Sequence, residues 1–116
     1  MVDEDGVNEA ENMTLPFKGW GHCSIQIDND TIMTTGGYSG EYFDRKETHI
    51  LNLSTEEWST GPALNQARNS HGCGKVKIGS KNFALVTGGN GADRSFELLD
   101  LDDINGKWIN GNVIIY

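Results

Sequence analysis

The stretch Thr31-Ile32-Met33-Thr34-Thr35-Gly36-Gly37 decides the fold, because it is a short run rich in β-branched residues that stops at a double glycine. A counterpart, Phe83-Ala84-Leu85-Val86-Thr87-Gly88-Gly89, follows roughly 50 residues later. Runs of this composition bounded by turn residues predict strands. Glycine pairs at their ends predict sharp turns. The two stretches therefore indicate β structure that occurs twice.

Further landmarks repeat in the same order, which indicates two copies of one unit. Gly21-His22-Cys23 returns as His71-Gly72-Cys73, Asn52-Leu53 as Asp100-Leu101, and Trp58 as Trp108. The first unit predicts strands over 23–27, 31–35 and 48–53 and a brief one from Trp58 to Gly61-Pro62; the second predicts them over 73–78, 83–87, 96–101 and 107–109. We therefore predict an all-β chain of two four-stranded antiparallel units.

Composition narrows the class of protein. The chain has 116 residues, 9 Lys and Arg against 17 Asp and Glu, and a formal net charge of −8. This balance argues against binding to nucleic acid and to an anionic membrane surface. No apolar stretch reaches the roughly 18 residues that a membrane span needs. Because the first residues are acidic and polar, we predict a disordered arm over 1–15.

A four-stranded unit with a double glycine after its second strand and a Trp in its fourth resembles the kelch repeat. Gly36-Gly37 with Trp58, and Gly88-Gly89 with Trp108, carry the resemblance, as does the segment 64–71, which resembles the inter-blade segment of that family. The resemblance implies a kelch-type β-propeller with one blade over 16–70, a second over 71–111 and the start of a further strand over 112–116. Two blades leave the ring incomplete, because propellers have typically about 4–8. We therefore expect the chain to be part of a longer kelch propeller, and a ring closed by several copies of the chain is the alternative.

The glycine pairs and both Trp residues have structural roles in this interpretation, the glycines at crowded turns and the Trp rings between blades. His22, Cys23, His71 and Cys73 lack the spacing of a zinc site, so we expect no metal. Cys23 and Cys73 are predicted to be buried thiols, and a bridge between them in an oxidising compartment remains the alternative.

We expect no enzyme, no catalytic residue and no cofactor, because no nucleophile motif is present. A galactose-oxidase-like enzyme fragment is the remotest alternative, since Tyr38, Tyr42 and Tyr116 match no copper-ligand spacing. If the chain is complete, its polar start predicts a cytoplasmic protein. If it is a fragment of a secreted protein, Asn12, Asn29 and Asn52 are glycosylation sites.

The resemblance to kelch domains points to loops on one rim as the place where a protein or peptide partner binds. Tyr, Trp and Arg are enriched among the residues that carry binding energy. The predicted partner-binding residues are Tyr38, Tyr42, Arg45, Arg68, Asn69, Ser70, Asn90 and Arg94. The alternative is an extracellular glycosylated domain that binds protein or carbohydrate. Open blade edges predict self-association in either case.

Overall fold

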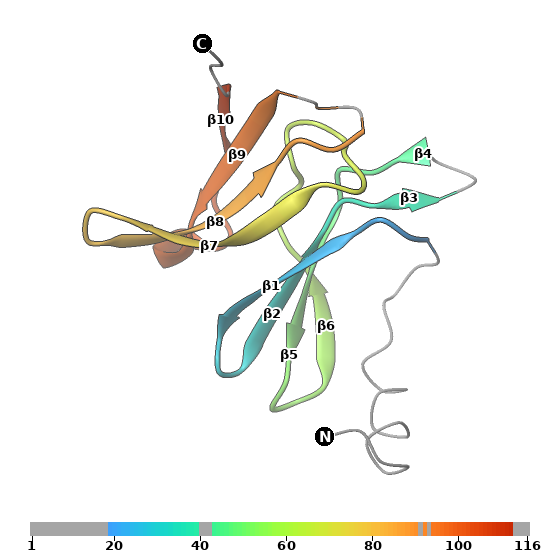
Figure 1. Ribbon diagram of the computed structural model, residues 1–116. Helices are drawn as coiled ribbons and strands as arrows, with labels where there is room; N and C mark the ends of the chain where they lie inside the picture. The colour runs from blue at the N-terminus through green and yellow to red at the C-terminus, as the bar shows by residue number, and fades with distance from the viewer. Residues whose placement is uncertain (1–18, 40–42, 91, 93, 113–116) are drawn as a thin grey trace.

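The fold is all-β, as the sequence predicts (Figure 1). The computed structural model describes residues 19–39, 43–90, 92 and 94–112. The first sheet contains β1 (Cys23–Asp28), β2 (Thr31–Thr35), β5 (Thr48–Asn52) and β6 (Glu57–Thr60), and the second contains β7 (Gly72–Ile78), β8 (Lys81–Thr87), β9 (Ser95–Asp100) and β10 (Ile109–Asn112). Both sheets are four-stranded and antiparallel. Their strands lie in the orders β1-β2-β5-β6 and β10-β9-β8-β7. In the described part of the chain, no helix is long and apolar enough to cross a membrane.

Three details differ from the expected strands. A two-stranded hairpin, β3 (Tyr38–Ser39) and β4 (Phe43–Asp44), stands between β2 and β5. The last strand of the second sheet begins at Ile109 rather than at residue 107, because a short 3-10 helix, η1 (Leu101–Asp103), follows β9, and Asp100 caps it by accepting a hydrogen bond from the amide of Asp102. Asn112 closes β10 opposite Ser95 instead of opening a further strand. Residues 1–15 and 113–116 lie outside the described residues.

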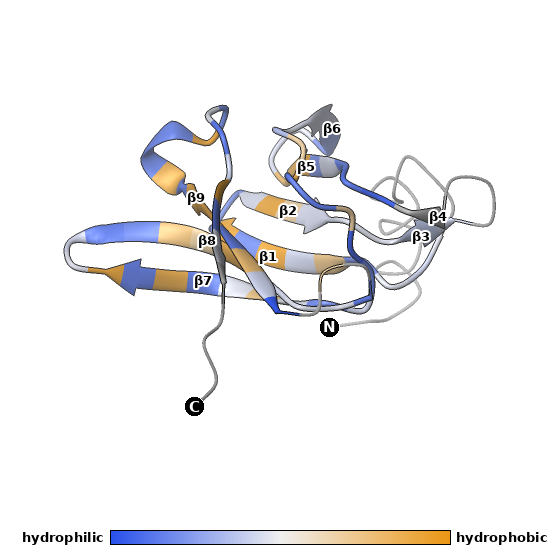
Figure 2. Cartoon of the chain, turned by 90° about the horizontal axis from the view of Figure 1, so that it is seen from above, coloured by the Kyte–Doolittle hydropathy of each residue, from blue (hydrophilic) through white to orange (hydrophobic). Residues whose placement is uncertain are grey.

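The two sheets pack face to face through β1 and β7, which lie next to one another in Figure 1. Ile25, Ile27 and Met33 of the first sheet form one core with Ala84, Val86 and Leu99 of the second sheet. Trp108, which directly precedes β10, and Leu64, in the linker between the sheets (residues 61–71), complete this core. Figure 2 shows hydrophobic stretches on the strands of both sheets. Burying apolar area between the sheets supplies the main driving force that holds them together.

The strand registers show how the two units correspond. Cys23 pairs with Thr35, the last residue of β2, whereas Gly72 pairs with Thr87, the last residue of β8. Cys23 therefore corresponds to Gly72, and Cys73 lies one position further along its strand. Successive side chains on a strand point to opposite faces. This one-residue offset turns the two cysteines toward each other across the junction of the sheets.

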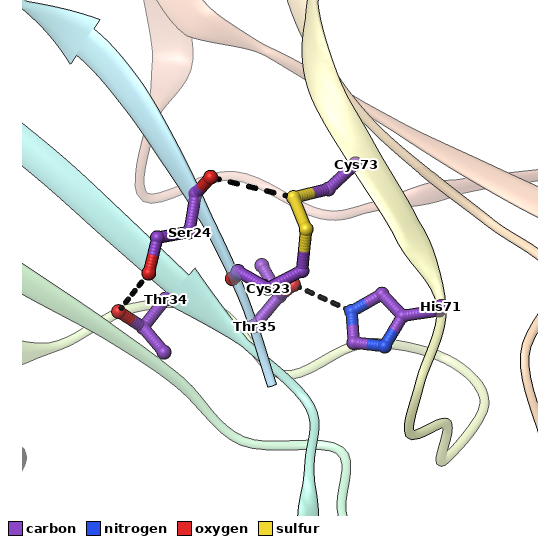
Figure 3. Close-up of a disulfide and its surroundings, with 6 residues drawn as sticks. All are labelled: Cys23, Ser24, Thr34, Thr35, His71 and Cys73. Atoms are coloured by element: carbon purple, nitrogen blue, oxygen red, sulfur yellow. Dashed lines mark hydrogen bonds between the residues drawn. A yellow bond between two sulfur atoms is a disulfide. The ribbon is translucent and has the colours of Figure 1, made fainter. Parts of the chain in front are cut away.

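Cys23 and Cys73 form a disulfide that joins β1 to β7, with 6.1 Å between their Cα atoms (Figure 3). The Sγ atom of Cys73 lies 3.5 Å from the carbonyl oxygen of Ser24. The prediction of two thiols is wrong, and the alternative of a bridge is what the structure contains. The spacing of Gly21-His22-Cys23 and His71-Gly72-Cys73 already differs by one residue, and that difference is the feature that permits the bond.

The double glycines occupy positions that only glycine fills without strain. Gly36 and Gly37 have φ of 61° and 114°, and Gly88 and Gly89 have φ of 65° and 89°. A Cβ atom on Gly36 would lie 2.4 Å from the carbonyl oxygen of Arg68. The predicted structural role of these glycines, a turn where the sheets crowd together, agrees with this geometry.

Gly36→Ala is expected to lower the free energy of unfolding by about 2 kcal/mol or more, because it adds a backbone clash to the strain of a positive φ. Denaturant unfolding measures the change. Gly79→Ala is the matched control, since Gly79 has φ of 65° and a Cβ atom there would meet no heavy atom within 4 Å, and it should lose only about 1 kcal/mol. Equal losses in the two variants would show that the contact with Arg68 is unimportant.

The two Trp residues lie in different environments. Trp108 is 4% exposed, and its Nε1 donates a 2.9 Å hydrogen bond to the carbonyl of Pro62 in the linker. It packs between the sheets, as predicted. Trp58 is half-buried and pairs with Leu51 on the face of the first sheet turned away from the second. Its predicted position between two sheets is not the one found in the described structure, because no second sheet covers that face.

Candidate partner-binding rim

Arg68, one of the predicted partner-binding residues, is buried beneath the rim loops instead of being exposed on them. Its side chain is 0% exposed and forms a 2.9 Å ion pair with Glu97, which is equally buried. The guanidinium also donates to the carbonyls of Gly88 and Ser95 at 3.1 Å and to the Ser95 hydroxyl at 2.9 Å. These contacts tie the linker between the sheets to the second sheet. We therefore remove Arg68 from the partner-binding residues, because a partner at the surface does not reach a fully buried side chain.

Glu97 completes this buried network from the middle of β9. Its carboxylate accepts hydrogen bonds from the backbone amides of Asn65 and Gln66 at 2.7 and 3.1 Å, in addition to the bond from Arg68. Each carboxylate oxygen thus has a donor, which offsets the cost of burying the charge. Sequence reasoning did not select Glu97. The signal that could have found it is a single acidic residue inside the apolar run Phe96-Glu97-Leu98-Leu99.

Two further predicted binding residues are also largely enclosed. The side chain of Arg45 is 11% exposed and pairs with Glu47, and its Nη1 donates to the hydroxyl of Ser39 at 3.3 Å. Asn69 is 6% exposed and exchanges backbone hydrogen bonds with Asn90. Both residues hold the loops in place, and neither offers much surface to a partner. Tyr42 lies outside the described residues.

Three of the remaining predicted residues, Tyr38, Ser70 and Asn90, lie on segments joined by backbone hydrogen bonds. Tyr38 and Trp20 exchange backbone hydrogen bonds of 2.7 and 3.0 Å. The next residue, Gly21, accepts a 2.7 Å bond from the amide of Ser70. Asn69, the residue before Ser70, forms an isolated bridge with Asn90, which follows β8 and lies outside the strands. We call the exposed or half-buried side chains of Tyr38, Trp20, Ser70 and Asn90 the rim strip.

Trp20 is the most prominent side chain of the rim strip. It is 60% exposed, and its ring centroid lies 4.8 Å from that of Tyr38 at an interplanar angle of 47°. Trp20 is not among the partner-binding residues predicted from the sequence. Arg94, in the loop that follows β8, is exposed. The rim strip thus combines a tilted pair of aromatic rings with the polar side chains of Ser70 and Asn90.

Three histidines lie close to this end of the sheets, and His71 is the most enclosed of them. The hydroxyl of Thr35 donates to the carbonyl of Cys23, so the 2.8 Å bond between Thr35 and His71 Nε2 has the imidazole as donor (Figure 3). The other ring nitrogen, Nδ1, is buried with no hydrogen-bond partner among the described residues. Desolvation, and next the charge of Arg68, lower the pKa of His71 from 6.5 to about 4.

Acidification is expected to destabilise the fold through His71. Between pH 6.5 and about 4 the unfolded imidazole binds a proton and the folded one does not, so the free energy of unfolding falls as the pH falls, by about 3 kcal/mol in total across this window. Burial lowers the pKa of His22 and His49 as well, which acts in the same direction. Urea unfolding at a series of pH values measures the slope.

His71→Gln is the control, because an amide keeps a donor for Thr35 but does not titrate. Its stability should depend less on pH than that of the natural chain between pH 6.5 and about 4. Identical slopes for the two proteins would exclude His71 as the cause.

No group of three or more His, Cys, Asp or Glu side chains in the described part of the chain is arranged to hold a metal ion. Both cysteines are used in the disulfide, so neither is a free thiol. Comparison of the sequence with known protein families gave no match, and comparison with curated proteins gave none. The chemistry of the rim is therefore the basis for any functional interpretation.

Proposed function

We propose that this chain is a non-enzymatic protein-interaction module, built from two kelch-like blades of a β-propeller, that recognises a protein or peptide through the rim strip. The observation that carries the proposal is the exposed Trp20 ring packed against Tyr38. Large aromatic side chains that are held in place but exposed are typical anchors of protein interfaces, because they bury much area at low entropic cost.

The backbone supports this role by joining the segments of the strip through hydrogen bonds. Trp20 is held by Tyr38, and Ser70 is held by Gly21, through hydrogen bonds of 2.7–3.0 Å. The linker behind the strip is fastened by the buried pair Arg68 and Glu97. A surface that is rigid before binding loses less conformational entropy when a partner arrives. Exposed Asn90 and Arg94 would then provide polar contacts around the aromatic anchor.

The test is selection of peptides from a random displayed library against the natural chain, followed by affinity measurement on the selected peptides. We expect Trp20→Ala to weaken binding by about 30-fold, the effect of losing a typical anchor residue. Arg94→Ala should have a smaller effect, because charged residues at the edge of an interface contribute little.

Thr55→Ala is the matched control, since Thr55 is exposed in the turn between β5 and β6 at the opposite end of the first sheet. It should leave the affinity unchanged. If no peptide is enriched, or if the enriched peptides bind Trp20→Ala as tightly as the natural chain, the rim strip is not the recognition site.

A second candidate is an extracellular, glycosylated binding domain, and the disulfide favours it. Disulfides form and persist mainly in oxidising compartments. Asn29, in the turn between β1 and β2, is exposed, and so is Asn52 at the end of β5. Both lie at the end of the first sheet away from the rim strip, where a glycan leaves the strip open. Asn12 lies outside the described residues.

Expression through a secretory pathway followed by mass measurement tests this candidate. We expect an added mass that a glycosidase removes and that falls in steps in Asn29→Gln and Asn52→Gln. A secreted chain with the mass of the bare polypeptide would count against it. Peptide binding at the rim strip is measured separately, so the two candidates can fail independently.

A further inference from the structure

One face of the second sheet is apolar and open. The side chains of Val76, Ile78, Leu85, Thr87, Phe96 and Leu98 line a shallow groove of about 450 Å³. These residues come from β7, β8 and β9 and point away from the first sheet, because they alternate with the core residues Ala84, Val86 and Leu99. Ile109 of β10 continues the same face and is 60% exposed. A contiguous apolar surface of this kind marks an interaction site.

The repeat shows what the same face does in the first sheet. By strand register, Val76 corresponds to Ile27, Leu85 to Met33, Thr87 to Thr35 and Phe96 to Thr48. All four residues of the first sheet are buried, at 7%, 0%, 0% and 0% exposure, where the second sheet covers them or the linker closes over them. Their counterparts in the second sheet are only half-buried. The open face is therefore a docking surface for another sheet of the same kind.

The chain also carries the surface that would pack on this docking surface. We call the face of the first sheet that is turned away from the second sheet the far face. Position by position, it corresponds to the face with which the second sheet contacts the first. On that contacting face, Lys75 donates a 2.7 Å hydrogen bond to the carbonyl of Ile27. The counterpart of Lys75 is Gln26, which is exposed. Its side-chain amide carries two protons, one of which it donates to the carbonyl of Asp28 at 3.3 Å. Gln26 is thus placed to reach the backbone of Val76 in a second copy.

Trp58 gives an independent sign that this far face is incomplete. Its counterpart Trp108 donates its indole proton to Pro62 at 2.9 Å. The Nε1 atom of Trp58 is buried but has no hydrogen-bond partner among the described residues. A buried donor without an acceptor costs about 1–3 kcal/mol. The residue of the second unit that corresponds to Pro62 is Asn112, the last residue of β10, whose carbonyl in a neighbouring copy would supply that acceptor.

From these observations we infer that a second copy of the chain docks head to tail, with the far face of its first sheet on the open face of the second sheet. The two surfaces differ, so the contact is heterologous and continues from copy to copy until a ring closes. Since propellers close with about 4–8 four-stranded sheets, we expect about two to four copies in the ring. This contact is separate from the rim strip and does not depend on the partner proposed for it.

Light scattering after size exclusion, together with circular dichroism, tests the inference on the full chain. The natural chain should be folded and have at least twice the mass of one copy. Leu98→Lys places a charge in the middle of the open face. Ser24→Arg blocks the far face. Ser24 is exposed and corresponds to Cys73, which is bonded to Cys23 of the first sheet, so a large side chain at Ser24 would lie in the contact between copies. Each variant alone should run at the mass of one copy.

Mixing the two variants distinguishes head-to-tail docking from other arrangements. Leu98→Lys retains an intact far face, and Ser24→Arg retains an intact open face, so an equimolar mixture should form a complex of two copies and no larger one. Thr55→Lys, in an exposed turn, is the control for added charge and should keep the full assembly. If Leu98→Lys fails to fold, Ile109→Lys replaces it, because Ile109 is 60% exposed on the same face.

Three results would overturn the inference. The first is a natural chain that is folded and remains a single copy at high concentration. The second is an assembly that Ser24→Arg leaves intact, because two open faces would then be packed against each other. The third is a mixture of the two variants that stays at the mass of one copy. Loss of peptide binding at Trp20 would leave all of these measurements unchanged, so the inference and the proposed function are tested separately.

Discussion

Arg68→Met is expected to lower the free energy of unfolding by about 3–5 kcal/mol, the usual cost of removing one partner of a buried ion pair. The substitution leaves the carboxylate of Glu97 buried without its cation. It also removes the donors to the carbonyls of Gly88 and Ser95. The linker between the sheets would then lose its main attachment to the second sheet. Chemical denaturation followed by circular dichroism measures the loss.

A double-mutant cycle separates the ion pair from the rest of the network. Glu97→Leu alone should be strongly destabilising, because it leaves the buried guanidinium of Arg68 without its counter-charge and the amides of Asn65 and Gln66 without an acceptor. The double variant Arg68→Met with Glu97→Leu should lose less than the sum of the two single losses. Arg94→Met, on an exposed Arg, is the control and should change stability by less than about 0.5 kcal/mol. Additive losses would show that the two charges do not stabilise each other.

Replacing both cysteines, as Cys23→Ser with Cys73→Ser, is expected to cost about 4 kcal/mol. The disulfide closes a loop with a sequence separation of 50 residues, and the loss of chain entropy in the unfolded state for a loop of that size has about this magnitude. The bond also joins β1 directly to β7, which are the strands where the sheets meet. Denaturation of the natural chain and of the double variant under oxidising conditions measures the difference.

Reductant supplies the matched control for this prediction. It should lower the stability of the natural chain to about that of the double variant, and it should not affect the double variant. A natural chain whose unfolding midpoint is the same with and without reductant would contradict the assigned role of the bond. The comparison also separates the effect of the lost bond from that of the two new serine hydroxyls, because the reduced natural chain has cysteines at positions 23 and 73.

The strands and their order followed from local patterns that the sequence displays. The run 31–35 and its counterpart 83–87 are β-branched or apolar and end at double glycines, so both become the second strand of a sheet. The turn Asp28 to Thr31 and the turn Ile78 to Lys81 close tight hairpins in the same way. These strand and turn preferences depend on only a few consecutive residues, so they can be predicted from the sequence.

The partner-binding residues were predicted less well, because exposure depends on contacts between distant segments. The sequence predicts Arg68 to be an exposed cation in the linker. In the structure it is buried, because it pairs with Glu97, which lies 29 residues further along the chain. Arg45 and Asn69 are enclosed in the same manner by Ser39 and Asn90. Trp20 gains its prominence only where Tyr38 packs beside it. A sequence pattern does not show which of two similar polar residues will find a buried partner.

By itself the sequence determined that this protein is all-β, that it consists of two similar units, and that glycine pairs close their second strands, because strand and turn preferences are local. Only the tertiary structure decided that Cys23 bonds to Cys73, that Arg68 belongs to the interior, and that one face of the second sheet stays open. The first two features arise where residues 29 and 50 positions apart in the chain meet. Their free energies come from burial and from pairing across the junction, which packing of the two sheets creates.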